Sequence, residues 1–151
     1  MTTRERIEQD LTKELKARNA SAVSTLRMLR AALKNAEIDK MKPLEEADVI
    51  DVLGREVKKL RDGLESFVAG GREDLAAPAR QEIALLETYL PAQLDDAGLK
   101  SIVEQKLQAI GPLTEKDFGR LMKEVMKEAQ GRAEGARVSK AVKDALAAAK
   151  T

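Results

Sequence analysis

The sequence contains no cysteine, no histidine and no tryptophan among its 151 residues. Without cysteine the chain has no disulfide, no thiolate nucleophile and no zinc-finger ligand set. Without histidine, Ser-His-Asp triads and imidazole acid–base chemistry are excluded as well. Aromatic residues are limited to two Phe and one Tyr, so stacking of bases on aromatic rings is not a general binding strategy here. We therefore predict no catalytic residue, no bound metal and no other cofactor.

An excess of charge of one sign is also missing. There are 27 basic and 26 acidic residues, which gives a net charge of +1 and argues against a polyanion binder that acts by net charge alone. The first five residues lack the apolar core of a signal peptide, and no apolar run approaches the roughly 18 residues that a membrane span requires. The sequence alone predicts a cytoplasmic protein without membrane contact.

Hydrophobic residues make up 43% of the chain and charged residues 35%. Because aromatic residues are so few, the core must be built from Ala, Leu, Val, Ile and Met, a composition typical of all-α proteins. No stretch alternates apolar and polar residues with the period of two that marks a strand. The predicted fold is therefore all-α and multihelical, with an N-terminal four-helix part followed by a small C-terminal three-helix tail.

Apolar residues recur at helical spacing throughout the N-terminal part. The predicted helices cover residues 3–17, residues 19–39, a long segment after Pro43 that ends at Val68, and residues 72–90. Thr2 and Glu5 form the pattern of a capping box at the first start, and Asn19 is a capping residue for the second. We interpret Gly54 and Gly63 as points of close helix packing. Pro78 either kinks the fourth helix, which we favour, or marks the first turn of its longer half.

Pro91 directly follows the last predicted helix of the N-terminal part. It marks the predicted boundary between domains of residues 1–92 and 93–151. A fifth helix begins at Asp95 or Asp96 and ends at Gly111. A sixth begins at a capping box of Thr114 and Asp117 and ends at Gly131, and a seventh follows residues 132–135. From Phe118 onward the chain carries eight basic and four acidic side chains, so the end of the tail is basic.

Two sets of basic residues are candidates for contact with the phosphates of a nucleic acid. The residues predicted to gather on one rim of the tail are Arg120, Lys123, Lys127, Gly131, Arg132, Arg137 and Lys140. The second helix adds a stripe of Arg27, Arg30 and Lys34. The alternative for both sets is an ordinary solvated face, or lysines that complement the dipole at the end of a helix.

Several segments of the chain resemble the GatB/YqeY family, in particular its small free-standing YqeY-like members. They are residues 24–38 (STLRMLRAALKNAEI), 69–75 (AGGREDL) and 87–94 (ETYLPAQL). Gly119 and residues 125–127 and 131–133 are similar to the tail domain of the GatB subunit of the tRNA-dependent aspartyl/glutamyl amidotransferase. The family usually has Gly-[Lys/Arg]-Ala-Asp-Gly where this chain has Glu134 in place of the aspartate.

The resemblance implies tRNA as a partner, because that tail is a tRNA-binding appendage. The kinase-like and glutaminase active sites of the amidotransferase lie in parts that this chain does not have. We therefore expect a noncatalytic tRNA-binding module associated with a tRNA-dependent amidotransferase or with translation. Two alternatives remain open. One is a helical adaptor that binds another protein through an exposed apolar strip that includes Ile50, Leu53 and Leu64. The other is an accessory subunit of a carbon–nitrogen ligase with glutamine as amido-N-donor, which would bind amidotransferase subunits.

Overall fold

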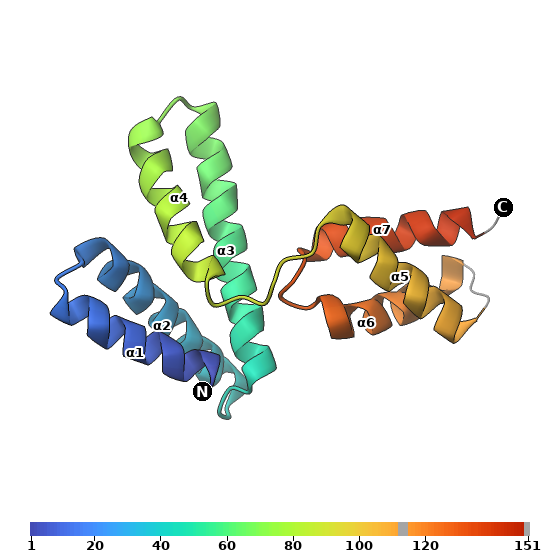
Figure 1. The fold of residues 1–151 in the computed structure, drawn as a ribbon, viewed down its shortest axis with the longest axis horizontal. Helices are drawn as coiled ribbons and strands as arrows, with labels where there is room; N and C mark the ends of the chain where they lie inside the picture. Colours follow the sequence, from blue (N-terminus) through green and yellow to red (C-terminus); the bar gives the residue numbers. More distant parts are fainter. Residues whose placement is uncertain (112–114, 150–151) are drawn as a thin grey trace. The chain divides into compact units, whose positions relative to one another are not determined.

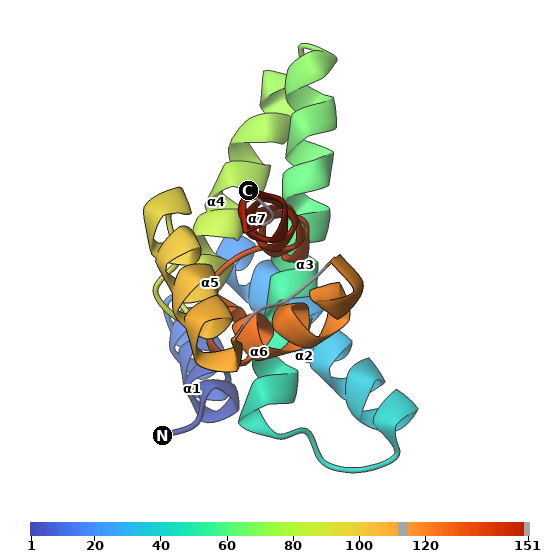
Figure 2. The ribbon, with the colours of Figure 1, turned by 90° about the vertical axis from the view of Figure 1, so that its right-hand side faces the viewer.

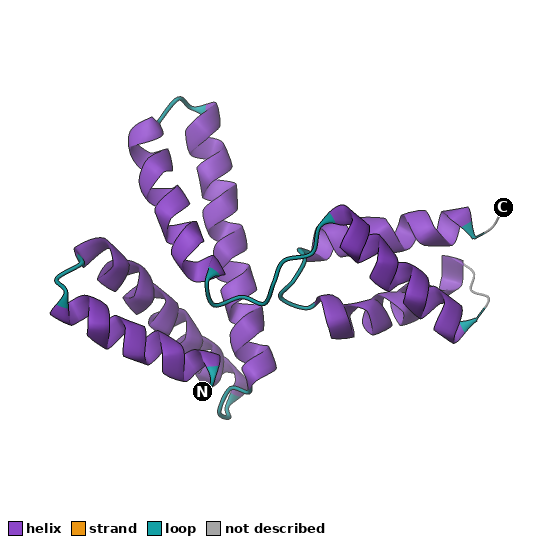
Figure 3. Cartoon of the chain, viewed as in Figure 1, coloured by secondary structure: helices purple, strands orange, loops and turns teal. Residues whose placement is uncertain are grey.

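The computed structural model describes residues 1–111 and 115–149. Over these residues the chain forms seven α-helices and one short 3-10 helix, without a strand, which confirms the all-α prediction (Figures 1 and 3). None of the described helices is long and apolar enough to cross a membrane. The chain divides into two compact units, Met1–Leu90 and Pro91–Thr151, and each is considered by itself.

Four helices build the first unit as two consecutive helical hairpins (Figure 1). Their bounds are α1 (Thr3–Lys16), α2 (Ala20–Lys40), α3 (Glu46–Ala69) and α4 (Glu73–Glu87). The predicted capping box is confirmed, because the Thr2 side chain accepts from the Glu5 amide while the Glu5 carboxylate accepts from the Thr2 amide. Asn19 likewise caps α2 through the amide of Ala22. These local contacts fix where the helices begin.

The core of the first unit is formed by leucine, isoleucine and valine side chains from all four helices. Fully buried members are Ile7 of α1, Leu26, Leu29 and Leu33 of α2, Leu53 of α3 and Leu86 of α4. Burying one such side chain stabilises the fold by about 1.5–3 kcal/mol. The apolar stripes found in the sequence therefore face one another.

In the long hairpin, the interpretation of the two glycines is wrong, and one of the two alternatives for Pro78 is excluded. A Cβ atom added at Gly54 or Gly63 would meet no atom within 4 Å, so neither glycine marks a close helix contact. Helix α4 begins at Glu73 and continues through Pro78, so Pro78 does not mark the start of a helix. The proline still removes one backbone hydrogen bond, because it has no N–H to donate to the carbonyl four residues earlier.

Tyr89 connects the end of α4 to α1. Its side chain is only 3% exposed, and its hydroxyl donates a hydrogen bond to the Asp10 carboxylate. The Arg6 guanidinium lies over the ring, 5.3 Å from its centre. Burial, assisted by the bond to Asp10, raises the pKa of the Tyr89 hydroxyl well above its usual value. The hydroxyl is therefore neutral over the whole physiological range.

The second unit is a bundle of three helices that contact one another in pairs (Figure 2). Its elements are α5 (Asp96–Ile110), a 3-10 turn at Glu115–Asp117, α6 (Phe118–Ala129) and α7 (Gly135–Ala148). Fully buried Leu121, Val125, Val138 and Val142 form the centre of its core. The predicted capping residue Thr114 lies outside the described residues.

Candidate nucleic-acid interface

The turn between α6 and α7 holds the segment that leads into α5. Gly131 has a φ of +75°, a backbone conformation that favours glycine, and it ends α6 as predicted. The Arg132 Nε donates to the Ala92 carbonyl at 3.1 Å, and the Leu94 amide donates to the Arg132 carbonyl at 2.7 Å. Gln93 adds a bond from its side-chain amide to the Gly131 carbonyl at 2.8 Å. Arg132 therefore has a structural role in this turn.

Arg137 holds the same segment from the first turn of α7. Its guanidinium donates to the Leu94 carbonyl at 3.1 Å and to the Asp96 carboxylate at 2.9 Å. These bonds join the N-terminal ends of α5 and α7. The signal in the sequence for this role is weak, because a basic residue near a helix start gives no indication of which carbonyl or carboxylate it will meet.

Helix α6 carries the basic stripe, which we define as Arg120, Lys123 and Lys127. All three side chains are exposed, and their spacing of three, four and seven residues places them on one face of the helix. The opposite face is buried through Leu121 and Val125. The burial of one face therefore turns the basic stripe toward solvent.

Glu124 is the acidic neighbour of the basic stripe. Lys127 donates to its carboxylate at 2.8 Å, and this bond, with further attraction from nearby Lys106 and Lys123, holds the Glu124 pKa below its usual value. The Lys127–Glu124 pair is exposed, and exposed pairs of this kind contribute little to stability. Among the residues that the structure describes, Arg120 and Lys123 make no ion pair.

Lys140 belongs to a different surface. It lines a groove between α5 and α7 together with Arg137 and residues of α5, and no residue of α6 takes part in that lining. The structure therefore brings Arg120, Lys123 and Lys127 together, whereas Arg137 and Lys140 line the α5–α7 groove and Arg132 is bonded to the segment before α5. The predicted convergence of all these side chains on one rim is not what the bundle shows.

The predicted stripe on α2 is exposed along its length. Arg27, Arg30 and Lys34 all lie at the surface of the first unit. Arg30 pairs with Glu8 of α1 across 3.6 Å, so the stripe is partly neutralised by its own hairpin. It is a second candidate surface for phosphate contact.

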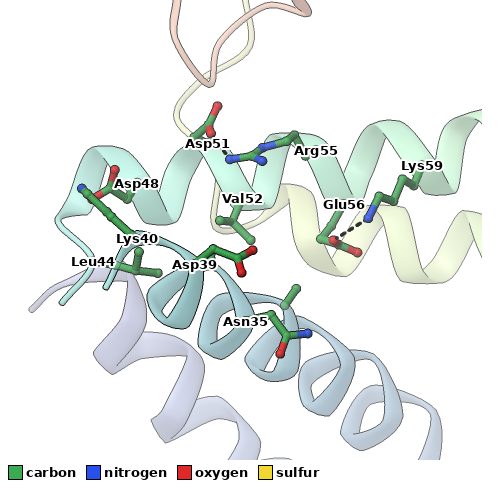
Figure 4. A pocket seen from close by; sticks show the side chains of 12 residues that line it. Asn35, Asp39, Lys40, Leu44, Asp48, Asp51, Val52, Arg55, Glu56 and Lys59 are labelled. Atoms are coloured by element: carbon green, nitrogen blue, oxygen red, sulfur yellow. Dashed lines mark hydrogen bonds and ion pairs between the residues drawn. The ribbon is translucent and has the colours of Figure 1, made fainter. Parts of the chain in front are cut away.

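A charged groove of about 520 Å³ lies between α2 and α3 in the first unit (Figure 4). Three carboxylates of its lining have basic partners. The pairs are Lys40 with Asp48, Arg55 with Asp51 and Lys59 with Glu56. The hydrogen bond from Lys40 lowers the Asp48 pKa, which keeps this carboxyl ionised and unsuited to act as a general acid near neutral pH. Across the described residues, no cluster of carboxylates could hold a metal ion.

The apolar strip proposed for a protein adaptor is part of the core. Leu53 is fully buried, and Ile50 and Leu64 are partly buried and packed against the core of the first unit. The prediction that these three side chains form an exposed contact surface is therefore wrong. The exposed large apolar residues of this unit include Ile38, Met41 and Val68 instead.

A family model described as Yqey-like protein matches residues 4–146 of the chain. The chain belongs to the YqeY-like family. Among curated proteins, this YqeY-like chain is similar to "Altered inheritance of mitochondria protein 41, mitochondrial" from several fungi. It is 33% identical to the Eremothecium gossypii protein over 57% of this chain and 48% of that protein. For Kluyveromyces lactis the identity is 32% over 79% of this chain and 64% of that protein. For Pyrenophora tritici-repentis the identity is 25% over 95% of this chain and 80% of that protein.

Two consequences follow for the predictions made from sequence. The prediction of a cytoplasmic location is contradicted, because these YqeY-like relatives are named as mitochondrial proteins. The chain spans about half to two-thirds of the length of the first two relatives. Similarity to the amidotransferase tail, in contrast, stays a prediction that rests on residues 119–133.

Proposed function

We propose that this YqeY-like protein is a noncatalytic RNA-binding module that contacts tRNA through the basic stripe on α6. The observation that carries this proposal is the exposure of Arg120, Lys123 and Lys127 on one helix face, where Arg120 and Lys123 make no ion pair within the described part of the chain. Seven residues of helix span about 10 Å, enough for the three side chains to reach about two or three neighbouring phosphates.

The bonds of Arg132 and Arg137 within the second unit favour α6 over these two residues as the site of RNA contact. One guanidinium nitrogen of each side chain is engaged, that of Arg132 with Ala92 and that of Arg137 with Leu94 and Asp96, so their contribution to RNA contact is secondary in this proposal. Binding by the basic stripe needs no rearrangement of these bonds. When RNA binds, Lys127 gives up its weak surface ion pair with Glu124 and contacts a phosphate instead.

The choice of tRNA and of a noncatalytic role has separate support. The resemblance of residues 119–133 to the amidotransferase tail favours tRNA among RNA classes, and it favours action beside a tRNA-dependent amidotransferase. The ion pairs of the α2–α3 groove favour a noncatalytic role, because three of its carboxylates are engaged by basic neighbours and the bond from Lys40 lowers the pKa of Asp48.

The test is binding of the purified chain to unfractionated tRNA across a salt series. We compare the natural sequence with Arg120→Glu/Lys123→Glu/Lys127→Glu. Each lost phosphate contact lowers the slope of log affinity against log salt by roughly 0.7–0.9, so the triple variant is expected to lower it by about 2.

A variant of α2 with the same change in charge is the matched control. Arg27→Glu/Arg30→Glu/Lys34→Glu is expected to keep most of the salt dependence if α6 is the contact. Equal losses in both variants would mean that net charge, and not the basic stripe, drives binding. No binding by the natural sequence near physiological salt would contradict the proposed function altogether.

A further inference from the structure

The groove between α5 and α7 is a hollow of the second unit with a volume of about 960 Å³. Its floor is apolar and includes Val103 of α5 and the small residues Ala141 and Ala145 of α7. Small residues let another helix approach closely. Charged side chains from both helices stand along the two edges of this floor.

The edge charges form two bands across the groove. The Arg137–Asp96 bond fixes the register, because it joins the N-terminal ends of α5 and α7. Counting one turn along each helix reaches Lys100 and Lys140, which we call the positive band. A second turn reaches Glu104 and Asp144, which we call the negative band, about 6 Å farther along the groove.

The four side chains of the bands are exposed, and none makes an ion pair with a described residue. Within each helix the lysine precedes the acid by four residues. That order is the less favourable one for an ion pair inside a helix, and the pair is not formed. Stabilisation within α5 and α7 therefore does not account for the bands.

The bands are complementary to a copy of themselves. Consider a two-fold axis that lies parallel to the floor, crosses the groove at right angles to its length and passes between the bands. Rotation about this axis turns the second copy face to face with the first and reverses the direction of its groove. The positive band of each copy then faces the negative band of the other, and the small residues of the two floors meet at the axis. A partner helix with one band of charge would complement only half of this pattern.

We propose that the α5–α7 groove is the interface of a homodimer in which the positive band of each copy pairs with the negative band of the other. The basic stripe of α6 lies outside this groove, so the dimer presents two such stripes. This inference is independent of RNA binding.

Charge-swap variants of the full chain test the pairing by sedimentation equilibrium. Lys100→Glu/Lys140→Glu makes both bands acidic, and Glu104→Lys/Asp144→Lys makes both bands basic. We expect the natural chain to dimerise with a Kd in about the micromolar range, and each variant to raise that Kd at least about tenfold. Mixing the two variants in equal amounts is expected to restore a dimer, because every acidic band then meets a basic one.

Two further variants make the outcome decisive. The combined fourfold swap exchanges the two bands and is expected to restore the homodimer, which also shows that the substituted helices fold. Lys123→Glu/Lys127→Glu changes the net charge on α6 by the same amount as Lys100→Glu/Lys140→Glu, and it is expected to leave the Kd unchanged.

A natural chain that remains monomeric, including one whose groove binds only an amphipathic helix of another protein, would overturn the proposal. A dimer whose Kd is unchanged by the charge swaps would overturn it as well, as would charge-swap variants that do not associate when they are mixed.

Discussion

Replacement of Tyr89 by phenylalanine is predicted to change how the stability of the protein depends on pH. Tyr89 is the single tyrosine of a chain without tryptophan, so the absorbance of tyrosinate reports on this residue alone. Its hydroxyl is buried and bound to Asp10, and its pKa is raised in the folded state. Folding therefore favours the neutral phenol.

The sign of the effect follows from this raised pKa. The contribution of the neutral hydroxyl to stability is fully present below the unfolded pKa of about 10 and is lost as the pH rises toward the folded pKa. One pH unit above the unfolded pKa, the loss amounts to about 1.4 kcal/mol. Phenylalanine has no such loss.

Tyr89→Phe also removes the hydrogen bond to Asp10, which lowers the free energy of unfolding at neutral pH by about 1 kcal/mol. The ring under Arg6 is retained, so the substitution isolates the hydroxyl. We therefore expect the natural chain to be more stable by about 1 kcal/mol near pH 7, and the two chains to be about equal near pH 11.

The assay is urea unfolding followed by circular dichroism at a series of pH values, with tyrosinate absorbance measured in parallel. In the natural chain, tyrosinate should form together with the loss of helix. Titration of Tyr89 near pH 10 with the helices intact would refute the buried hydrogen bond, as would a difference in stability that stays constant to pH 11.

Two other predictions concern backbone positions. Gly54→Ala is expected to raise the free energy of unfolding by about 0.5–1 kcal/mol in thermal unfolding, because the added Cβ meets nothing, whereas Gly71→Ala, at a φ of +69°, should lower it. Equal effects at both positions would contradict the assigned backbone conformations. Arg137→Met is expected to speed hydrogen exchange of the Leu94 amide about fivefold, through a loss of about 1 kcal/mol. The control, Lys123→Met, should leave that exchange rate unchanged.

Helix positions and helix ends were predictable because they depend on neighbours in the sequence. The capping box of Thr2 and Glu5 needs only three residues, and Gly131 ends α6 through its own backbone conformation. Whether Pro78 kinks α4 or begins it was harder to predict. Packing of Ile83 and Leu86 against the core outweighs the single hydrogen bond that proline removes.

The candidate site was predictable only in part, for a related reason. Helical spacing alone indicates that Arg120, Lys123 and Lys127 share a face. Whether Arg132, Arg137 and Lys140 join that face depends on how α5 and α7 pack together, and spacing carries no such information. The burial of Leu53, offered in sequence as part of an exposed strip, shows the same limit.

The bond between Tyr89 and Asp10 bears on the order in which the first unit is completed during synthesis. The two residues are 79 positions apart, whereas the α1–α2 and α3–α4 hairpins join neighbouring segments. The hairpins need only short loops to close, so they can form while the chain is still emerging from the ribosome. The contact that ties α4 to α1 must wait until the last residues of the unit have been added. A nascent chain that stalls just before Tyr89 would hold nearly all of the helices of this unit and still lack the hydrogen bond between Tyr89 and Asp10.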